Sequence, residues 1–401
     1  MPRIAVASKP CNDPHRFYWA YKSVANFHLP PFHCVFAFHS HYYCHCIFVH
    51  RRRSTALIRM ADAEHPAAVA AAAVADFETR TRHFFDLIND GNIQQLRVLI
   101  DSLDADELNT LLRRAVDPVA RVRRTGSALW SAFFGRHFDI VDLLLEKGAD
   151  PNEPMVGTVN NRRTNMTPLF TAVSRSLLPV CRQLVARGAN IDLGTDSAIT
   201  PLMIACNKSE MEIVTFLVEN GANVNLQNGD GETALMTACC RKNVDIVRFL
   251  LSHGANVEQL DYSGQSPLMQ AAMSDNLEAC RLLVEEWAAE VNQQSIEGEF
   301  TALICAASRG YLAVVNFLIE HGADIQHADV QGLNALMWAV KRGRTEMARH
   351  LVAIGADTDQ RNTEGKRAQD LAEESGNAEM VAIFRTAADD NGRHAEGTDG
   401  Q

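Results

Sequence analysis

The chain has 401 residues, of which 47% are apolar, so it is long and apolar enough for two or three ordinary domains or for one elongated array. Its formal net charge is −11, and it is unevenly distributed, because the first 59 residues hold eight Lys or Arg and one acid and carry +7, which leaves −18 on the remainder. So acidic a body argues against a general nucleic-acid-binding protein.

Residues 1–59 differ in composition from the rest of the chain. They contain seven His, four Cys and the aromatic run FHCVFAFHSHYYCHCIFVHRRR. Zinc binding is one interpretation, because thiolates and imidazoles are common zinc ligands, but the spacing matches no four-ligand site. The candidate ligands are Cys34, His39, His41, Cys44, His45, Cys46 and His50.

A membrane anchor is a second interpretation of the same segment. Its apolar stretch precedes the arginines at 51–53, but the four histidines from His33 to His45 are costly in hydrocarbon. The interpretation we favour is that residues 1–59 are disordered or not translated, with Met60 as the true start. We therefore expect no metal site and no membrane contact.

The next segments predict helices. The alanine-rich residues 60–82 predict a linker or an N-terminal helix, and FFDLINDGNIQQLRVLIDSL from Phe84 reads as a degenerate first repeat unit. A full unit begins with SALWSA at Ser127. The next unit starts 40 residues later instead of 33, so EPMVGTVNNRRTN is predicted to contain a long loop.

A period of 33 residues then continues toward the C-terminus. Each unit opens with a residue that can cap a helix, often followed by Pro, as in TPLFTA at 167 and TPLMIA at 200. The cap matters because the first N–H groups of a helix lack internal partners. The opening residues are Thr167, Thr200, Thr233, Ser266, Thr301, Asn334 and Arg367, with a slip of two residues after Ser266.

A second helix follows in each unit, with one apolar stripe such as Ile213, Val214 and Leu217. It ends at a Gly-Ala turn, and a short polar hairpin leads to the next unit. One unit is two residues longer than its neighbours and has Trp287 in place of the turn glycine, which marks either a bend in the array or an exposed anchor.

The last unit, RAQDLAEESGNAEMVAIF, is unusually polar. Arg367 and Gln369 stand where other units have a hydroxyl residue and Leu, which suits the outer face of a terminal capping repeat. We expect a repeat domain at 83–386, with about seven full repeats and degenerate terminal ones, and a disordered tail at 387–401.

This pattern resembles the ankyrin repeat over about residues 125–385. The shared features are the cap-Pro-Leu start, a small Ala in each first helix, the Gly-Ala turn and the period. The resemblance implies an all-α fold, an ankyrin-repeat solenoid of stacked helix pairs with β-hairpin fingers. In that family the first helices and the fingers line a concave face that binds proteins, so we expect a protein partner.

Two columns of residues are expected on that face. The fourth position of each unit is apolar, and it either binds a partner segment or packs between neighbouring first helices. This apolar column contains Trp130, Phe170, Met203, Met236, Met269, Ile304 and Met337.

The second column lies eight residues beyond each cap. Five of its seven members are cations, Arg175, Lys208, Arg241, Arg309 and Arg342, and we call them the basic row. The row could bind an acidic segment or a terminal carboxylate, or it could merely complement the negative ends of helix dipoles. Tyr262 and Trp338 add aromatic area near the same face.

Acids on the fingers flank the basic row, and they either neutralise it internally or select a partner of mixed charge. They are Asp230, Glu232, Asp261, Glu297, Glu299 and Asp329.

The chain shows no catalytic motif. It has no phosphate-binding glycine loop, no G-x-S-x-G, no H-E-x-x-H and no kinase signature. We therefore expect a monomeric, non-catalytic scaffold without cofactor, catalytic residue or nucleic-acid partner. Six cysteines in helical patterns are expected in the core of a cytoplasmic or nuclear protein: Cys181, Cys206, Cys239, Cys240, Cys280 and Cys305.

A substrate receptor of a cullin-RING ubiquitin ligase is the alternative. The short first unit and the long loop resemble the ankyrin part of the feminization-protein receptors, which recognise chain-end degrons. Those receptors continue into further helical repeats and a ligase-docking box, whereas this sequence ends about 15 residues after its last repeat. The sequence leaves open which partner is bound and whether a ligase is involved.

Overall fold

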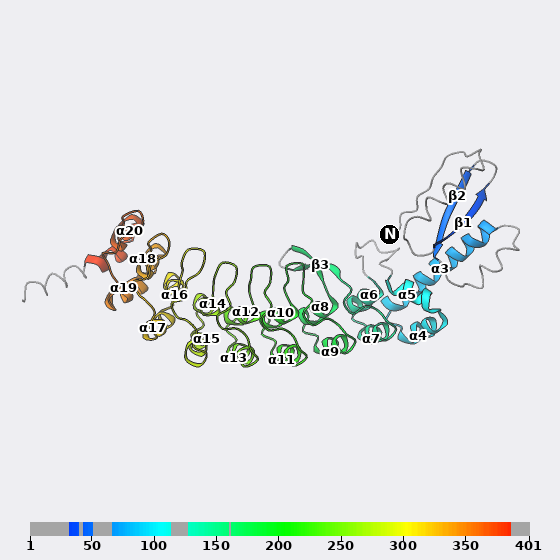
Figure 1. Cartoon of the computed structure of the whole chain (residues 1–401), viewed down its shortest axis with the longest axis horizontal. Helices are drawn as coiled ribbons and strands as arrows, with labels where there is room; N and C mark the ends of the chain where they lie inside the picture. The colour runs from blue at the N-terminus through cyan, green and yellow to red at the C-terminus, as the bar shows by residue number, and fades with distance from the viewer. Residues whose placement is uncertain (1–31, 40–42, 51–65, 114–126, 160–161, 386–401) are drawn as a thin grey trace, which may run out of the picture. The chain divides into compact units, whose positions relative to one another are not determined.

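The computed structural model describes residues 32–39, 43–50, 66–113, 127–159 and 162–385 (Figure 1). The chain divides into two compact units, residues 1–149 and 150–401, so the expected repeat domain at 83–386 spans both. Each unit is described separately below.

The described residues of the first unit form a strand pair and five helices. Strands β1 (Phe32–His39) and β2 (Tyr43–His50) pair antiparallel, with Phe32 opposite His50. They are the described part of the segment 1–59. Their side chains and the rest of that segment lie outside the described residues, so the zinc, anchor and untranslated-leader interpretations stay predictions.

The helices of the first unit are α3 (Pro66–Asn89), α4 (Ile93–Ser102), α5 (Ala105–Arg113), α6 (Ala128–Gly135) and α7 (Phe138–Glu146). Helix α3 continues without a break past residue 83, so the expected boundary between an N-terminal helix and the first repeat falls inside one helix. Phe84, Trp130 and Phe133 are fully buried and fill the core of this unit. The long loop expected after α7 begins the second unit.

That loop contains strands β3 (Met155–Val159) and β4 (Arg162–Met166), which pair antiparallel with Met155 opposite Met166. Helix pairs follow: α8 (Pro168–Ser174) with α9 (Leu178–Ala186), α10 (Pro201–Asn207) with α11 (Met211–Glu219), and α12 (Ala234–Cys240) with α13 (Val244–Ser252). Then come α14 (Pro267–Met273) with α15 (Leu277–Arg281), α16 (Ala302–Arg309) with α17 (Leu312–Glu320), α18 (Ala335–Lys341) with α19 (Thr345–Ala353), and α20 (Ala368–Ser375).

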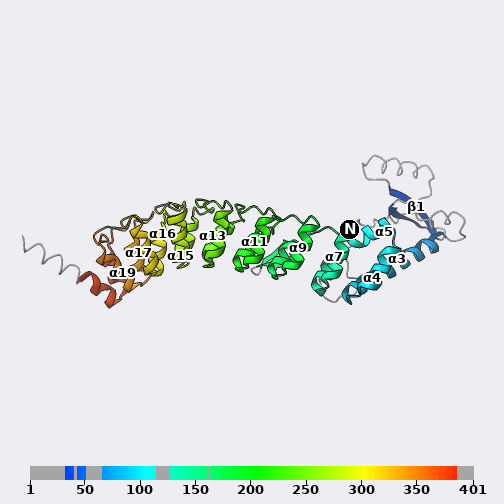
Figure 2. The same ribbon diagram turned by 90° about the horizontal axis from the view of Figure 1, so that it is seen from below.

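Within this second unit the first helices of the pairs form one row and the second helices form another (Figures 1 and 2). Successive first helices pack side by side from α8 to α20. No single pair buries its apolar stripe alone, so each repeat completes the core of its neighbours. The expected solenoid of stacked helix pairs is therefore present.

Six of the predicted helix caps are present, whereas the side chains of Ser127 and Arg367 make no capping hydrogen bond within the described residues. The side chains of six opening residues each accept the backbone N–H of the third residue that follows, as Thr167 does from Phe170 at 3.1 Å. The others are Thr200, Thr233, Ser266, Thr301 and Asn334.

The segments between helix pairs, here called fingers, contain mostly tight turns rather than long strands. In the finger from Asp329 to Leu333, the Asp329 carboxylate accepts the N–H groups of Gln331 and Leu333 at 2.8 and 2.9 Å. Asn228, Asp261 and Asn362 hold their own fingers in the same way. Such side-chain bonds fix a turn without a strand ladder.

Amide side chains also tie the outer turns of successive repeats. Asn225 accepts the backbone N–H of Asn256 at 2.8 Å and donates to the carbonyl of Gly254 at 2.9 Å. Asn292 makes the equivalent bonds to Asp324 and Gly322, both at 2.9 Å. These bonds supplement apolar burial between neighbouring repeats.

The two-residue insertion at Trp287 is absorbed as a π-helical turn, Leu282–Glu286, that continues α15. A π turn adds residues without lengthening the helix proportionally. Trp287 stays 38% exposed, and the left-handed conformation that other units give to Gly falls on Ala288 at φ +53°.

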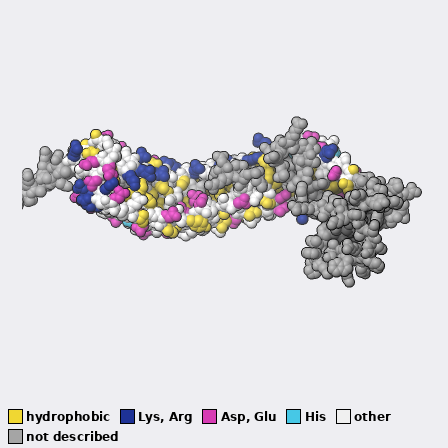
Figure 3. Space-filling view, turned by 90° about the horizontal axis from the view of Figure 1, so that it is seen from above, with side chains coloured by type: hydrophobic (Ala, Val, Ile, Leu, Met, Phe, Trp, Pro, Cys, Tyr) yellow, Lys and Arg dark blue, Asp and Glu magenta, His cyan; other side chains and the backbone are white. Residues whose placement is uncertain are grey.

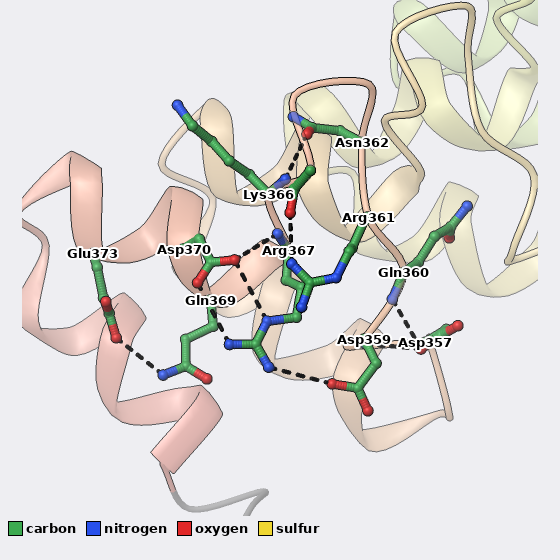
Figure 4. A network of polar contacts seen from close by, with 11 residues as sticks. Asp357, Asp359, Gln360, Arg361, Asn362, Lys366, Arg367, Gln369, Asp370 and Glu373 are labelled. Carbon is green, nitrogen blue, oxygen red and sulfur yellow. Dashed lines mark hydrogen bonds and ion pairs between the residues drawn. The ribbon is translucent and has the colours of Figure 1, made fainter.

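The last described repeat carries a polar network around Arg367 (Figure 4). The Asp370 carboxylate accepts the backbone N–H of Arg367 at 2.8 Å, while the Arg367 guanidinium lies 3.6 Å from Asp359. Asp370 thus accepts the N–H of the opening residue, in the reverse direction to the bond that the opening side chains of earlier repeats make.

Candidate functional site

The five members of the basic row occupy the same position on five first helices of the second unit. Arg175, Lys208, Arg241 and Arg342 are the C-terminal capping residues of α8, α10, α12 and α18, and Arg309 is the last residue of α16. All five are exposed. The column predicted from register is therefore a column on the surface.

Three of these cations contact neutral groups. Lys208 Nζ lies 3.3 Å from Ser176 Oγ, and Arg241 Nε donates to Asn207 Oδ1 at 2.7 Å. The Arg342 guanidinium lies 5.3 Å from the centre of the Trp338 ring. Within the described residues, none of Lys208, Arg241, Arg309 and Arg342 forms an ion pair with a carboxylate.

The finger acids do not neutralise this row in the structure. Asp261 and Asp329 are buried, and their carboxylates accept backbone N–H groups of their own turns. Asp230, Glu297 and Glu299 are exposed, and among the described residues they form no ion pair with the row. The basic row and the exposed finger acids can therefore bind different ligands.

The apolar column is a correction to the sequence-based expectation of a binding stripe. Every member is buried, with Met203 the most accessible at 3%. These side chains pack between neighbouring first helices and cannot touch a partner in this arrangement. They are Trp130, Phe170, Met203, Met236, Met269, Ile304 and Met337.

Trp338 and Tyr262 differ sharply in exposure. Trp338 is 9% exposed, donates its indole N–H to Asp329 at 2.8 Å and lies 5.5 Å from the Phe300 ring. Its ring packs against the Arg342 guanidinium and exposes little surface of its own. Tyr262 is 65% exposed at the tip of its finger.

The sequence-based prediction missed two exposed fingertip residues. Ile296 and Val330 occupy the same finger position as Tyr262, and they are 71% and 57% exposed. Aligning the fingers by their turn residues, Asp261, Ser295 and Asp329, would have placed all three in one register. We call Tyr262, Ile296 and Val330 the apolar ridge.

Comparison with known proteins identifies the family. The family model for ankyrin repeats in three copies matches residues 155–228, 202–295, 263–329 and 289–362, which together span slightly more than half of the chain. The chain belongs to the ankyrin repeat family. A solved structure, the ankyrin repeat domain of human ASB11, is 29% identical over 55% of this chain and 97% of its own length, with a TM-score of 0.49. A search of curated proteins finds no match.

Ankyrin repeats are protein-interaction modules, and the ankyrin array here presents two kinds of surface. The basic row lies at the C-terminal ends of the first helices, and the apolar ridge lies on the fingers that precede their N-terminal ends. Figure 3 looks onto the finger side of the array and shows Lys and Arg gathered toward its C-terminal end.

Five of the six helical cysteines of the ankyrin repeats are buried as expected. They are Cys181, Cys206, Cys239, Cys280 and Cys305. Burial raises the pKa of the Cys181 and Cys280 thiols to about 12, so they stay protonated and unreactive at neutral pH. Cys240 is a correction, because it is exposed. It directly follows Cys239 on α12, and one residue turns a helix by about 100°.

The described residues contain no cluster of three or more His, Cys, Asp or Glu side chains that could hold a metal ion. Among the helices described, none combines the length and apolarity needed to cross a membrane.

Proposed function

We propose that this ankyrin repeat protein is a non-catalytic scaffold that binds an acidic segment of a partner protein along the basic row. The observation that carries this proposal is that Lys208, Arg241, Arg309 and Arg342 are exposed in one register and none is paired with a carboxylate within the described residues. An acidic side chain or a terminal carboxylate would supply the missing charge, and arginine binds carboxylates in bidentate geometry.

Helix dipoles alone do not account for the row. A cation near a helix C-terminus gains about 0.3–1 kcal/mol whichever helix it belongs to. Yet the second helices, which are longer, mostly end without Lys or Arg, as α11 does at Asn220 and α19 at Ile354. Among the described second helices of the second unit, α9 is followed by Arg187 and α15 ends at Arg281 before its π turn. Cations are therefore enriched at the ends of first helices, and this enrichment favours a ligand.

The test compares two triple variants of equal charge. In the row variant, Lys208, Arg241 and Arg309 become Gln, and in the control variant, Arg248, Arg281 and Arg349 on second helices become Gln. The control residues form exposed ion pairs with acids, and such pairs contribute little stability. Both variants should therefore keep the helical circular dichroism of the wild type.

Quantitative mass spectrometry of proteins captured by the three forms gives the result. We expect the row variant to lose the partners that wild type and control retain, and we expect those partners to elute with salt because exposed charges are screened. Equal capture by the row variant would contradict the proposal. Cullin components among the row-dependent partners would favour the ubiquitin-ligase alternative.

A further inference from the structure

The apolar ridge is a set of large apolar side chains that the fold leaves in solvent. Tyr262, Ile296 and Val330 are 65%, 71% and 57% exposed and stand at the same position of three successive fingers. Single exposed apolar residues are common on protein surfaces, whereas a contiguous set usually marks an interaction site. The equivalent residues of the flanking fingers are Gly229 and Thr363, so the ridge has defined ends.

Backbone hydrogen bonds hold the three tips in a fixed series. The N–H groups of Tyr262, Ile296 and Val330 donate to carbonyls of the preceding finger at 3.1, 3.0 and 3.2 Å. Tyr262 and Ile296 also lie against Gly231 and Gly264 of the preceding finger, where an added Cβ would approach their side chains to 2.7 and 2.6 Å. The ridge is therefore ordered before any partner binds, which reduces the entropic cost of binding.

The charge beside the ridge is negative. Glu297 and Glu299 are exposed on the finger of Ile296, Asp230 is exposed on the flanking finger before that of Tyr262, and none of the three forms an ion pair among the described residues. Between residues 227 and 333 the fingers carry no Lys or Arg, and their basic side chains are His253, His321 and His327. Acidic and hydrophobic side chains lie together over the middle of the array in Figure 3. A partner for this surface must therefore combine apolar and cationic side chains.

The spacing of the tips selects the conformation of that partner. First helices α14, α16 and α18 pack side by side, and packed helices lie about 8–10 Å apart, so successive tips are separated by about the same distance. Seven residues of α-helix rise about 10 Å and return to within about 20° of the same face. Apolar residues at i, i+7 and i+14 of one helix can therefore meet all three tips.

Extended segments fit less well. Three residues of β-strand also cover about 10 Å, but residues three apart point to opposite faces of a strand. Polyproline II repeats every three residues, but its recognition uses aromatic grooves, and two of the three ridge residues are aliphatic. We infer that the apolar ridge docks an amphipathic α-helix of a partner protein that presents apolar residues at i, i+7 and i+14 with Lys or Arg beside them.

The test is selection from a displayed library of 21-residue peptides on the full chain. The ridge variant replaces Tyr262, Ile296 and Val330 with Ser. A matched control replaces three exposed apolar residues outside the ridge with Ser, namely Leu193, Met211 and Ile354. A charge variant, Asp230→Asn with Glu297→Gln and Glu299→Gln, leaves the apolar contacts of the fingers intact and tests the same surface if the ridge variant folds poorly.

We expect selected peptides to carry apolar residues at seven-residue spacing with cations between them. Their affinity should fall about tenfold or more on the ridge and charge variants and stay unchanged on the control and on the row variant with Lys208, Arg241 and Arg309 changed to Gln. Selection of proline-rich peptides, of acidic peptides that need the basic row, of peptides that bind all forms alike, or of no peptide at all would overturn the inference. Because acidic peptides report on the row, failure here and failure of the proposed function give different results.

Discussion

The carboxylate of Asp329 accepts three N–H groups although the residue is only 5% exposed. One oxygen accepts from the backbone of Gln331 and Leu333, and the other accepts from the indole of Trp338 at 2.8 Å. Asn228 and Asn362 hold equivalent turns through a single amide oxygen and have no tryptophan to bind. The turn alone requires only one acceptor oxygen. The second carboxylate oxygen of Asp329 is therefore explained by its hydrogen bond from the indole.

Substitution of Asp329 should separate these two roles. Asp329→Ala leaves the N–H donors of Gln331, Leu333 and Trp338 without this acceptor, two of them in buried residues, and should lower the free energy of unfolding by about 2–3 kcal/mol. Asp329→Asn keeps the turn but places an amide against the indole, so it should lie between wild type and Ala. Urea unfolding followed by circular dichroism measures the order. Equal stability of the Asn and Ala variants would show that the turn bonds contribute little.

Register along the sequence predicted which cations share a column, but it could not predict which apolar side chains reach solvent. The basic row is exposed as a column because a cation at the end of a short helix has no core to enter. Met236 and Met269 are buried because the next repeat covers them, and that depends on the distance between repeats. Ile296 was missed because it is a lone apolar residue within its own polar turn, and only an alignment of successive fingers shows that it belongs to a series with Tyr262 and Val330.

At the scale of the element, helix starts were predictable and one helix end was not. A hydroxyl or amide residue at the start of a repeat has a single local task, so Thr200 or Ser266 can be read without the fold. The insertion before Ala288 could have formed a bulge, a bend or a loop. It forms a π turn, and the Ala289 N–H donates to the Leu283 carbonyl at 2.9 Å.

Ala288 should be a site where glycine stabilises the protein. Its φ of +53° is costly for a residue with a Cβ, by about 1–2 kcal/mol, whereas glycine loses about 0.5–1 kcal/mol more in chain entropy on folding. Ala288→Gly should therefore raise the free energy of unfolding by about 0.5–1 kcal/mol in urea titrations. The buried neighbour provides the control, because Ala289→Gly removes a packed methyl group and should destabilise. If both substitutions destabilise the protein, the inferred backbone strain at Ala288 is wrong.

At the scale of the whole molecule, the second unit is a linear array in which each repeat contacts its neighbours. The stability of such an array is close to a sum of repeat and interface contributions, so an end can fray while the middle stays folded. The network of Arg367, Asp370 and Asp359 lies in the last described repeat (Figure 4). The sequence predicted a polar capping repeat there, but the hydrogen bond from the Arg367 N–H to the Asp370 carboxylate follows only from the structure.

Asp370 should make the end of the array sensitive to acid. Its pKa is lowered below the ordinary value of 3.8 because its carboxylate accepts the Arg367 backbone N–H and then the guanidinium. A lowered pKa means that the stabilisation is complete above pH 3.8 and is lost as the pH falls through the folded-state pKa. The wild type should therefore have a higher melting temperature than the Asp370→Asn variant at pH 7. This difference in melting temperature should shrink below pH 3.8.

Hydrogen exchange at pH 7 locates the effect. Asp370→Asn should speed exchange in residues 345–385 and leave residues 167–207 unchanged, because coupling through an array decays with each interface. Glu346→Gln is the matched control. The Glu346 carboxylate is exposed on α19 and forms no hydrogen bond or ion pair within the described residues. Faster exchange in both regions would mean that the second unit unfolds as one cooperative block, and the nearest-neighbour account of its stability would be wrong.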